Sequence, residues 1–402
     1  MTRIDLREGR DWQEYELADE QAARLTASEL VQIKLGDRRG LWRVRDNGRV
    51  GAVKLGDVEL RIAPKIAIPR LFFLLGYAER QIFWRDQELD AGAHPDLLPA
   101  VAHAFARQVD RALCQGVLHG YRKIEESAPV IRGRIREADQ IRHRYGMSLP
   151  VEIRYDDFTV DIAENRLLLA AVRRLLQLQD VTGHTRTDLR RLLLRLDGVE
   201  PLTPGRSLPN WTPSRLNARY HSALRLAELV LRGGSYELDD GTNVRVDGLL
   251  LQMWRIFEDF VTTALTKALI SYGGRCRTQD SSRHLDHDRR IQLLPDLVYY
   301  RLDFDGDEKP AAVIDAKYKV DKTAGGHNPD IYQMLAYCTR FRLNRGHLVY
   351  AKGETEPRVH RVAGGSDIKI VQQGLDLACP PAMLLQQVAS LAEQIVGAAA
   401  IS

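Results

Sequence analysis

The chain has 402 residues, a formal net charge of +4 and 44% hydrophobic residues, so it is long enough for two or three domains with buried cores. Its four cysteines are far apart, which argues against a disulfide framework or a structural zinc site. The sequence has neither an apolar signal core nor a run of about 18 apolar residues. We therefore expect a cytoplasmic protein that does not enter a membrane.

The N-terminal half, residues 1–245, predicts an α+β region made of four segments. In chain order they are residues 1–68 (β-rich), 69–128 (helical), 129–160 (a β insertion) and 161–245 (helical). In the first segment, strand patterns flank Asn47-Gly48, which is a strong turn signal and predicts a β-hairpin. We interpret the half as a partner-docking region, with the first segment as a platform that carries no chemistry.

The β insertion carries three arginines at alternating positions, Arg132, Arg134 and Arg136. Such side chains could reach into a partner's active site as charges supplied in trans. For any single one of them, a solvated strand position is the more ordinary interpretation.

A helix is expected over residues 250–269, where apolar residues recur along one stripe. Glu258 lies at the edge of that stripe. A carboxylate among apolar side chains costs several kcal/mol unless it is paired or metal-bound. Glu258 is therefore a candidate metal ligand, and a structural salt bridge is an equally good interpretation.

Two acidic residues follow on neighbouring strand patterns. Asp296 precedes the strand-like residues 297–300, and a turn-rich segment then leads to an apolar run that ends in Asp315 and Lys317. Cross-strand neighbours lie about 5 Å apart, so Asp296 and Asp315 could share one divalent cation. Residues two apart on a strand face the same side, which places Lys317 beside Asp315.

This arrangement of residue types suits phosphodiester hydrolysis. Two carboxylates can hold Mg²⁺, which polarises a phosphate and acidifies a bound water. Lys317 would orient or deprotonate that water. A helix is expected next, with Gln333 and Tyr337 four apart on one face.

Pro295-Asp296, Asp315-Ala316-Lys317 and the later Gln333-x-x-x-Tyr337 together resemble the PD-(D/E)xK nuclease pattern of RecB-like members. The resemblance implies an α/β nuclease domain over residues 246–402, with a central mixed sheet flanked by helices. It also implies that Gln333 and Tyr337 steady the site or the substrate. The competing interpretation is a salt-bridged hairpin followed by an amphipathic helix.

Further segments resemble the McrC family, the endonuclease subunit of McrBC modification-dependent restriction systems. They are residues 60–66, 131–135, 158–167 and 254–260. The resemblance implies a McrB-like AAA+ GTPase hexamer as partner, double-stranded DNA with modified cytosine as substrate, and stimulation of the partner's GTP hydrolysis by the inserted N-terminal half. The sequence contains no Gly-x-x-x-x-Gly-Lys-(Ser/Thr) loop, so we expect GTP to bind the partner.

Two other functions remain open at the level of sequence. One is a regulatory subunit that activates a GTPase and whose nuclease fold is inactive. The other is a RecB-like nuclease that acts alone.

Overall fold

The chain folds as a mixed α/β protein with two compact units. The computed structural model describes residues 2–78, 96–178, 180–203, 207–233, 235–237, 243–245, 247–302, 306–320, 328–352, 357–363 and 367–399. One unit comprises Met1–Gly51, Asp57–Pro95 and Leu251–Ser402, and the other comprises Ala52–Gly56 and Asp96–Leu250. Most of the β-rich segment 1–68 therefore packs in the same unit as the C-terminal region, whereas the sequence grouped it with residues 69–245.

The N-terminal strands belong to two sheets. In one, β1 (Thr2–Arg7) lies parallel to β6 (Val58–Ala63), which also pairs with β5 (Arg49–Leu55). In the other, β4 (Leu41–Asp46) lies between β2 (Gln13–Glu16) and β3 (Val31–Leu35). Helix α1 (Asp19–Ser28) connects β2 to β3.

The hairpin predicted around Asn47-Gly48 is wrong, because β4 and β5 on its two sides belong to different sheets. Gly48 does make a tight turn, with φ of 71°. The turn carries the chain from one sheet to the other, so that Val44 is buried in the first and Val50 in the second.

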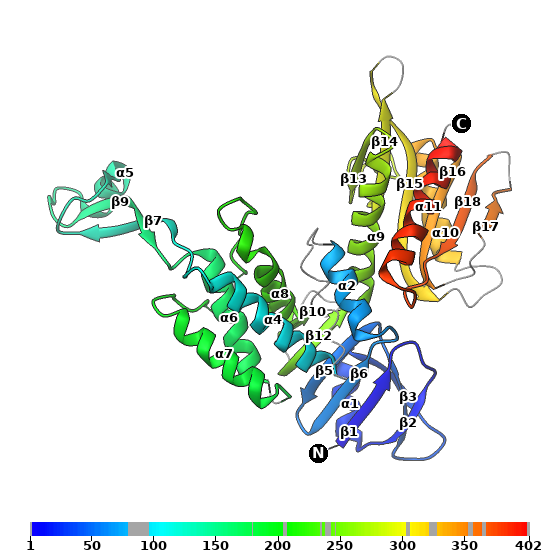
Figure 1. Ribbon diagram of the computed structural model, residues 1–402, viewed down its shortest axis with the longest axis horizontal. Coiled ribbons are helices and arrows are strands. Elements are labelled where there is room, and N and C mark those ends of the chain that lie inside the picture. Colours follow the sequence, from blue (N-terminus) through cyan, green and yellow to red (C-terminus); the bar gives the residue numbers. More distant parts are fainter. Residues whose placement is uncertain are drawn as a thin grey trace. The chain divides into compact units, whose positions relative to one another are not determined.

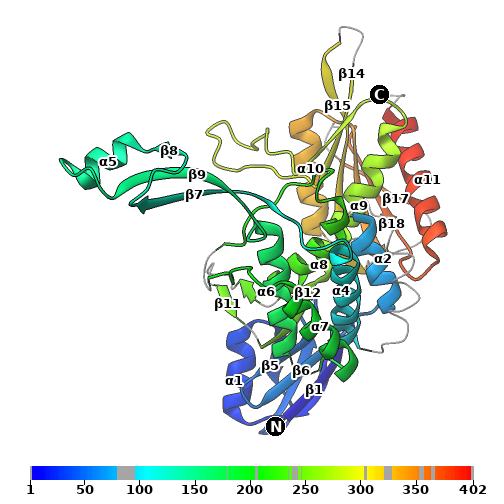
Figure 2. The same cartoon turned by 60° about the vertical axis from the view of Figure 1, so that its left-hand side comes forward.

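The second unit is a group of packed helices that carries a β arm. The helices are α4 (Leu97–Leu113), α6 (Ala163–Gln177), α7 (Gly183–Arg195) and α8 (His221–Arg232). The arm is formed by β7 (Gly120–Ala128), β8 (Arg134–Ile135), α5 (Glu137–Arg144) and β9 (Val151–Thr159). Figure 2 shows β7 and β9 running side by side away from α6, with α5 at the far end.

Four small elements remain in the described part of the chain. They are the 3-10 helix η1 (Ala218–Tyr220), β10 (Ser235–Glu237), β11 (Asn243–Arg245) and β12 (Asp247–Gln252). Strand β10 pairs with β11, and β12 pairs with β5. Strand β7 was not predicted, because its residues were included in the helical segment 69–128. The helix predicted at 250–269 begins too early, since residues 250–252 belong to β12. Strand β7 leaves few side chains buried, so it lacks the apolar alternation by which a strand is recognised in sequence.

A six-stranded mixed sheet dominates the C-terminal part of the first unit, in the order β13-β14-β15-β16-β18-β17. The strands are β13 (Arg275–Thr278), β14 (Leu297–Leu302), β15 (Glu308–Val320), β16 (Arg345–Lys352), β17 (Arg358–Arg361) and β18 (Lys369–Gly374). Strands β14 and β15 form the predicted antiparallel pair, and β16 then runs parallel to β15.

Helices cover both faces of this sheet (Figure 1). They are α9 (Met253–Ile270), α10 (Asn328–Phe341) and α11 (Pro381–Ala399), and α2 (Ile68–Ala78) packs on α9. Helix α10 buries Met334 against Val313 and Leu348 on one face. On the other face, α9 places Phe257 against Tyr318 and packs on α2 and α11. None of the described helices combines the length and hydropathy that a membrane crossing needs.

Candidate functional site

Asp296 and Asp315 lie together at one end of the central strand pair. Leu297 pairs with Ile314 in the antiparallel register, so the two acids occupy the next position of the same ladder. Both are buried, and Oδ2 of Asp296 accepts a 2.7 Å hydrogen bond from the backbone N–H of Ala316. The sheet therefore brings the two predicted acids to one place.

Lys317 and the two predicted residues of α10 form a chain of polar contacts beside these acids. Nζ of Lys317 lies 2.5 Å from Oδ2 of Asp315 and donates a 2.8 Å hydrogen bond to Oε1 of Gln333. Nε2 of Gln333 donates to the hydroxyl of Tyr337 at 3.0 Å, which itself donates to the carbonyl of Leu294 at 3.2 Å. The spacing of four on α10 thus fixes the position of the lysine.

Glu258 is connected to Asp296 by the side chain of Gln279, a residue that was not predicted from the sequence. Nε2 of Gln279 donates to Oε1 of Glu258 at 2.6 Å and to Oδ1 of Asp296 at 3.2 Å. Gln279 follows β13 in a left-handed conformation with φ of 48°. No motif in the sequence marks it, because its role depends on a loop conformation that brings it between two acids distant in the chain.

The acids are held in an environment that opposes their charge. Burial raises the pKa of Asp296 to about 7, and the nearby Glu258 adds to the effect. Burial also raises the pKa of Asp315 to about 6, with a further contribution from Asp296. The pKa of Glu258 is raised as well, chiefly by burial.

The pKa of Lys317 is raised, whereas burial alone would lower the pKa of an amine. Burial acts to lower its pKa, but the adjacent carboxylate of Asp315 outweighs it and the pKa is raised. The side chain therefore carries its proton at neutral pH.

The pair of acids fits a magnesium ion in one specific respect. Asp315 is buried, and apart from the contact of its Oδ2 with Nζ of Lys317 at 2.5 Å this oxygen accepts no hydrogen bond from the described residues, so it has a lone pair left for a cation. Within the described ranges no group of three or more His, Cys, Asp and Glu residues is arranged to hold a metal. Mg²⁺ usually takes one or two carboxylates and keeps several waters, so two acids are sufficient for it.

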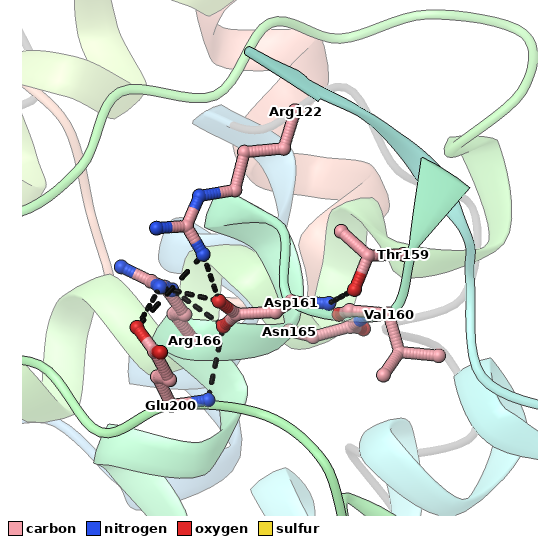
Figure 3. Close-up of polar contacts among 7 residues, drawn as sticks. All are labelled: Arg122, Thr159, Val160, Asp161, Asn165, Arg166 and Glu200. Carbon is pink, nitrogen blue, oxygen red and sulfur yellow. Dashed lines mark hydrogen bonds and ion pairs between the residues drawn. The ribbon is translucent and has the colours of Figure 1, made fainter. Parts of the chain in front are cut away.

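A second polar cluster lies at the root of the arm, as Figure 3 shows. Asp161, just after β9, is buried and accepts hydrogen bonds from Arg122 of β7, from Nε of Arg166 at 2.6 Å and from the backbone of Glu200 at 2.9 Å. The side chain of Asn165 is also buried and donates to the carbonyls of Leu118 at 2.8 Å and of Val160 at 2.7 Å. One amide thus joins the chain before β7 to the chain after β9.

The three arginines of the arm have different partners. Arg136 lies 3.1 Å from Glu125 and also pairs with Asp139, and Arg132 stacks over the ring of Tyr155. Arg134 makes no ion pair with any residue in the described part of the chain. Large apolar side chains are exposed around them: Tyr121, Val130, Ile131, Ile135, Ile141, Tyr145, Met147, Leu149 and Phe158.

Fold and site together define a mixed α/β protein with a buried pair of acids and an adjacent lysine. Comparison with family models matches residues 44–351 to the McrBC 5-methylcytosine restriction system component. The match covers more than half of the chain, so the protein belongs to this family.

One solved structure has a similar fold. A chain of the structure described as a refined half-complex from a tetradecameric assembly of Thermococcus gammatolerans McrB AAA+ hexamers with bound McrC matches with a TM-score of 0.59 and 18% identity, over 98% of this chain and 100% of that one. The cryo-EM structure of the Thermococcus gammatolerans McrBC complex matches with a TM-score of 0.40 and 20% identity, over 67% and 88%. The comparison with curated proteins gave no match.

Proposed function

We propose that this protein is the Mg²⁺-dependent DNA endonuclease subunit of a McrBC-type restriction complex, in which it cleaves DNA that carries modified cytosine. The observation that carries the proposal is the meeting of Asp296, Asp315 and Lys317 where the pairing of β14 with β15 ends, beside Gln333 and Tyr337. Membership of the 5-methylcytosine restriction family supports the choice of substrate.

In this proposal Asp296 and Asp315 hold the cation. Glu258 is the third acid of the site, and the side-chain amide of Gln279 connects it to Asp296. The bound cation would polarise the phosphate and acidify a water. Lys317 keeps its proton, so its role is to orient the water and stabilise charge on the phosphate rather than to act as a base. Gln333 holds the lysine amine in place, and Tyr337 holds Gln333.

The arm is proposed to dock on an AAA+ GTPase hexamer and to stimulate its GTP hydrolysis. The relative with the similar fold is described as bound to McrB AAA+ hexamers. Tyr121 of β7 is 77% exposed and Tyr145 after α5 is 88% exposed, and a group of large exposed apolar side chains is typical of a protein interface. Arg134 is the arginine whose charge is available to a partner.

A cleavage assay tests the nuclease proposal. The chain is mixed with its GTPase partner, GTP, Mg²⁺ and plasmid DNA with or without 5-methylcytosine. We expect cuts in methylated DNA only, and we expect Asp315→Ala to reduce the rate by at least about 10³-fold, because it removes a metal ligand. Asp288→Asn, on an exposed loop of the same unit, serves as the control and should cleave normally.

The alternatives give different results in the same assay. A chain that stimulates GTP hydrolysis but leaves all DNA intact would be a regulatory subunit. A chain that cuts without nucleotide or partner would be a stand-alone nuclease. Loss of cleavage and of partner binding together in Asp315→Ala would show that the substitution merely unfolds the unit.

A further inference from the structure

The strand that carries Asp315 and Lys317 is attached from its other face to the N-terminal sheet. Tyr318 follows Lys317 on β15, so strand alternation directs its side chain away from the acidic site. Its hydroxyl donates a 3.1 Å hydrogen bond to Oε2 of Glu8. Glu8 lies just after β1, more than 300 positions away in the sequence.

Glu8 is a buried acid that is hydrogen-bonded at this junction. Its backbone N–H donates to the carbonyl of Ala63 at 2.9 Å, and its Oε2 accepts from the backbone N–H of Lys65 at 3.0 Å. Nζ of Lys65 lies 3.7 Å from the centre of the Tyr318 ring. The carboxylate therefore joins the ends of β1 and β6 to β15.

Tyr318 also contacts the helix that carries the third candidate acid. Its ring lies 5.8 Å from that of Phe257 on α9, and Phe257 directly precedes Glu258. One side chain thus contacts α9 next to Glu258 and is bonded to Lys317 through the backbone. A small shift of the Tyr318 ring would therefore move Glu258 and Lys317 relative to Asp296 and Asp315.

We propose that Glu8, Lys65 and Tyr318 are positioning residues of the proposed nuclease site, which hold Lys317 and Glu258 at the correct places from the face opposite the substrate. The inference rests on the proposed nuclease function. It changes the interpretation of the N-terminal sheet, which becomes a structural part of the nuclease rather than a separate docking platform.

Two substitutions in the full-length chain test the inference. Tyr318→Phe removes the hydroxyl that reaches Glu8, and Glu8→Gln keeps the shape of the acid while removing its charge. Groups that orient metal ligands from outside the site typically change affinity or activity about 10–100-fold. We expect a loss of that size in the affinity for Mg²⁺, measured by calorimetry, and in kcat for methylated DNA with partner and GTP, while KM for DNA stays constant.

Matched controls separate positioning from general stability. Tyr299→Phe removes a buried tyrosine hydroxyl that donates to Gly273 from the neighbouring strand, and Asp5→Asn removes an exposed acid from β1. Both should bind Mg²⁺ and cleave as the wild type does. If Tyr318→Phe lowers Tm strongly, Lys65→Met tests the same junction while Glu8 and Tyr318 are both retained. It should lower Mg²⁺ affinity and kcat by the same factor and leave KM for DNA unchanged.

The outcomes distinguish this inference from the proposal on which it rests. A wild-type chain that neither binds Mg²⁺ nor cleaves DNA overturns both. A wild-type chain that does both, with the three variants within about twofold of it, overturns the inference alone. If Tyr299→Phe loses as much Mg²⁺ affinity and kcat as Tyr318→Phe does, the junction is only structural and the inference is overturned.

Discussion

Gln279 is the residue whose function depends most on tertiary structure. Its amide donates to Glu258 and to Asp296, two acids whose pKa values are both raised, chiefly by burial. Without a donor between them, the two carboxylates would turn apart or take up a proton.

We therefore predict that Gln279→Ala weakens Mg²⁺ binding and cleavage by about 10–100-fold, the range expected when a group that orients metal ligands is removed. Calorimetric titration with Mg²⁺ measures the first effect and plasmid cleavage the second. Gln292→Ala is the matched control, because its amide contacts only the loop carbonyl of Ser281 among the described residues and should have no effect. Equal affinities in the two variants would contradict the role given to Gln279.

The acids also make stability depend on pH. The pKa values of about 7 for Asp296 and about 6 for Asp315 lie above the value of about 3.9 for an unfolded aspartate. The folded state binds protons more tightly, so these groups contribute stability that is complete below about pH 4 and is lost as pH rises through about 6–7.

In the absence of divalent cations, Tm should fall between pH 5 and pH 8. Asp296→Asn should flatten this dependence and raise Tm at pH 8 by on the order of 5 °C, because the buried charge is gone. Adding Mg²⁺ at pH 8 should raise Tm of the wild type but not of Asp296→Asn. Thermal unfolding followed by circular dichroism checks both statements, and a Tm that rises with pH would refute them.

At the scale of secondary structure, α10 is held against β16 by a glycine. A Cβ on Gly346 would lie 2.4 Å from Sδ of Met334 and 2.6 Å from Sγ of Cys338. Helix α10 carries Gln333 and Tyr337, so a displacement here reaches the lysine of the site.

Gly346→Ala should therefore destabilise the protein by about 1–3 kcal/mol and lower the cleavage rate. Gly397→Ala, in α11 with no atom near its Cβ position, is the matched control and should be neutral or stabilising by up to about 1 kcal/mol. Urea unfolding measures both. Equal stability of the two variants would show that α10 can move without cost.

The secondary structure that positions the site could be predicted from sequence where a strong pattern coincides with burial. Strands β14 and β15 and helix α10 have such patterns, and the structure brings Asp296, Asp315, Lys317, Gln333 and Tyr337 together. Strand β7 lacks a buried apolar face and was missed, and the Asn47-Gly48 turn was assigned to a hairpin because a turn signal does not reveal which sheet each strand joins. Gln279 and Glu8 were missed because their partners lie far away in the sequence.

At the scale of the whole molecule, the proposed activities are assigned to separate parts of the chain. Replacing residues 121–158 by a short Gly-Ser linker between Gly120 and Thr159, which are paired neighbours, should remove the arm without disturbing the site of Asp296. The shortened chain should bind Mg²⁺ as the wild type does and lose at least about 10-fold of its stimulation of the partner's GTPase, because trans-acting contacts carry such effects. Steady-state GTP hydrolysis is the measurement, and unchanged stimulation would exclude the arm from that role.

The amide of Asn165 sets a mechanical property of that arm. It donates to the carbonyl of Leu118 just before β7 and to the carbonyl of Val160 just after β9, so both ends of the arm are tied to one side chain of α6. A force applied to the arm at Tyr145 is therefore passed to α6 through both of these hydrogen bonds as well as along β7 and β9.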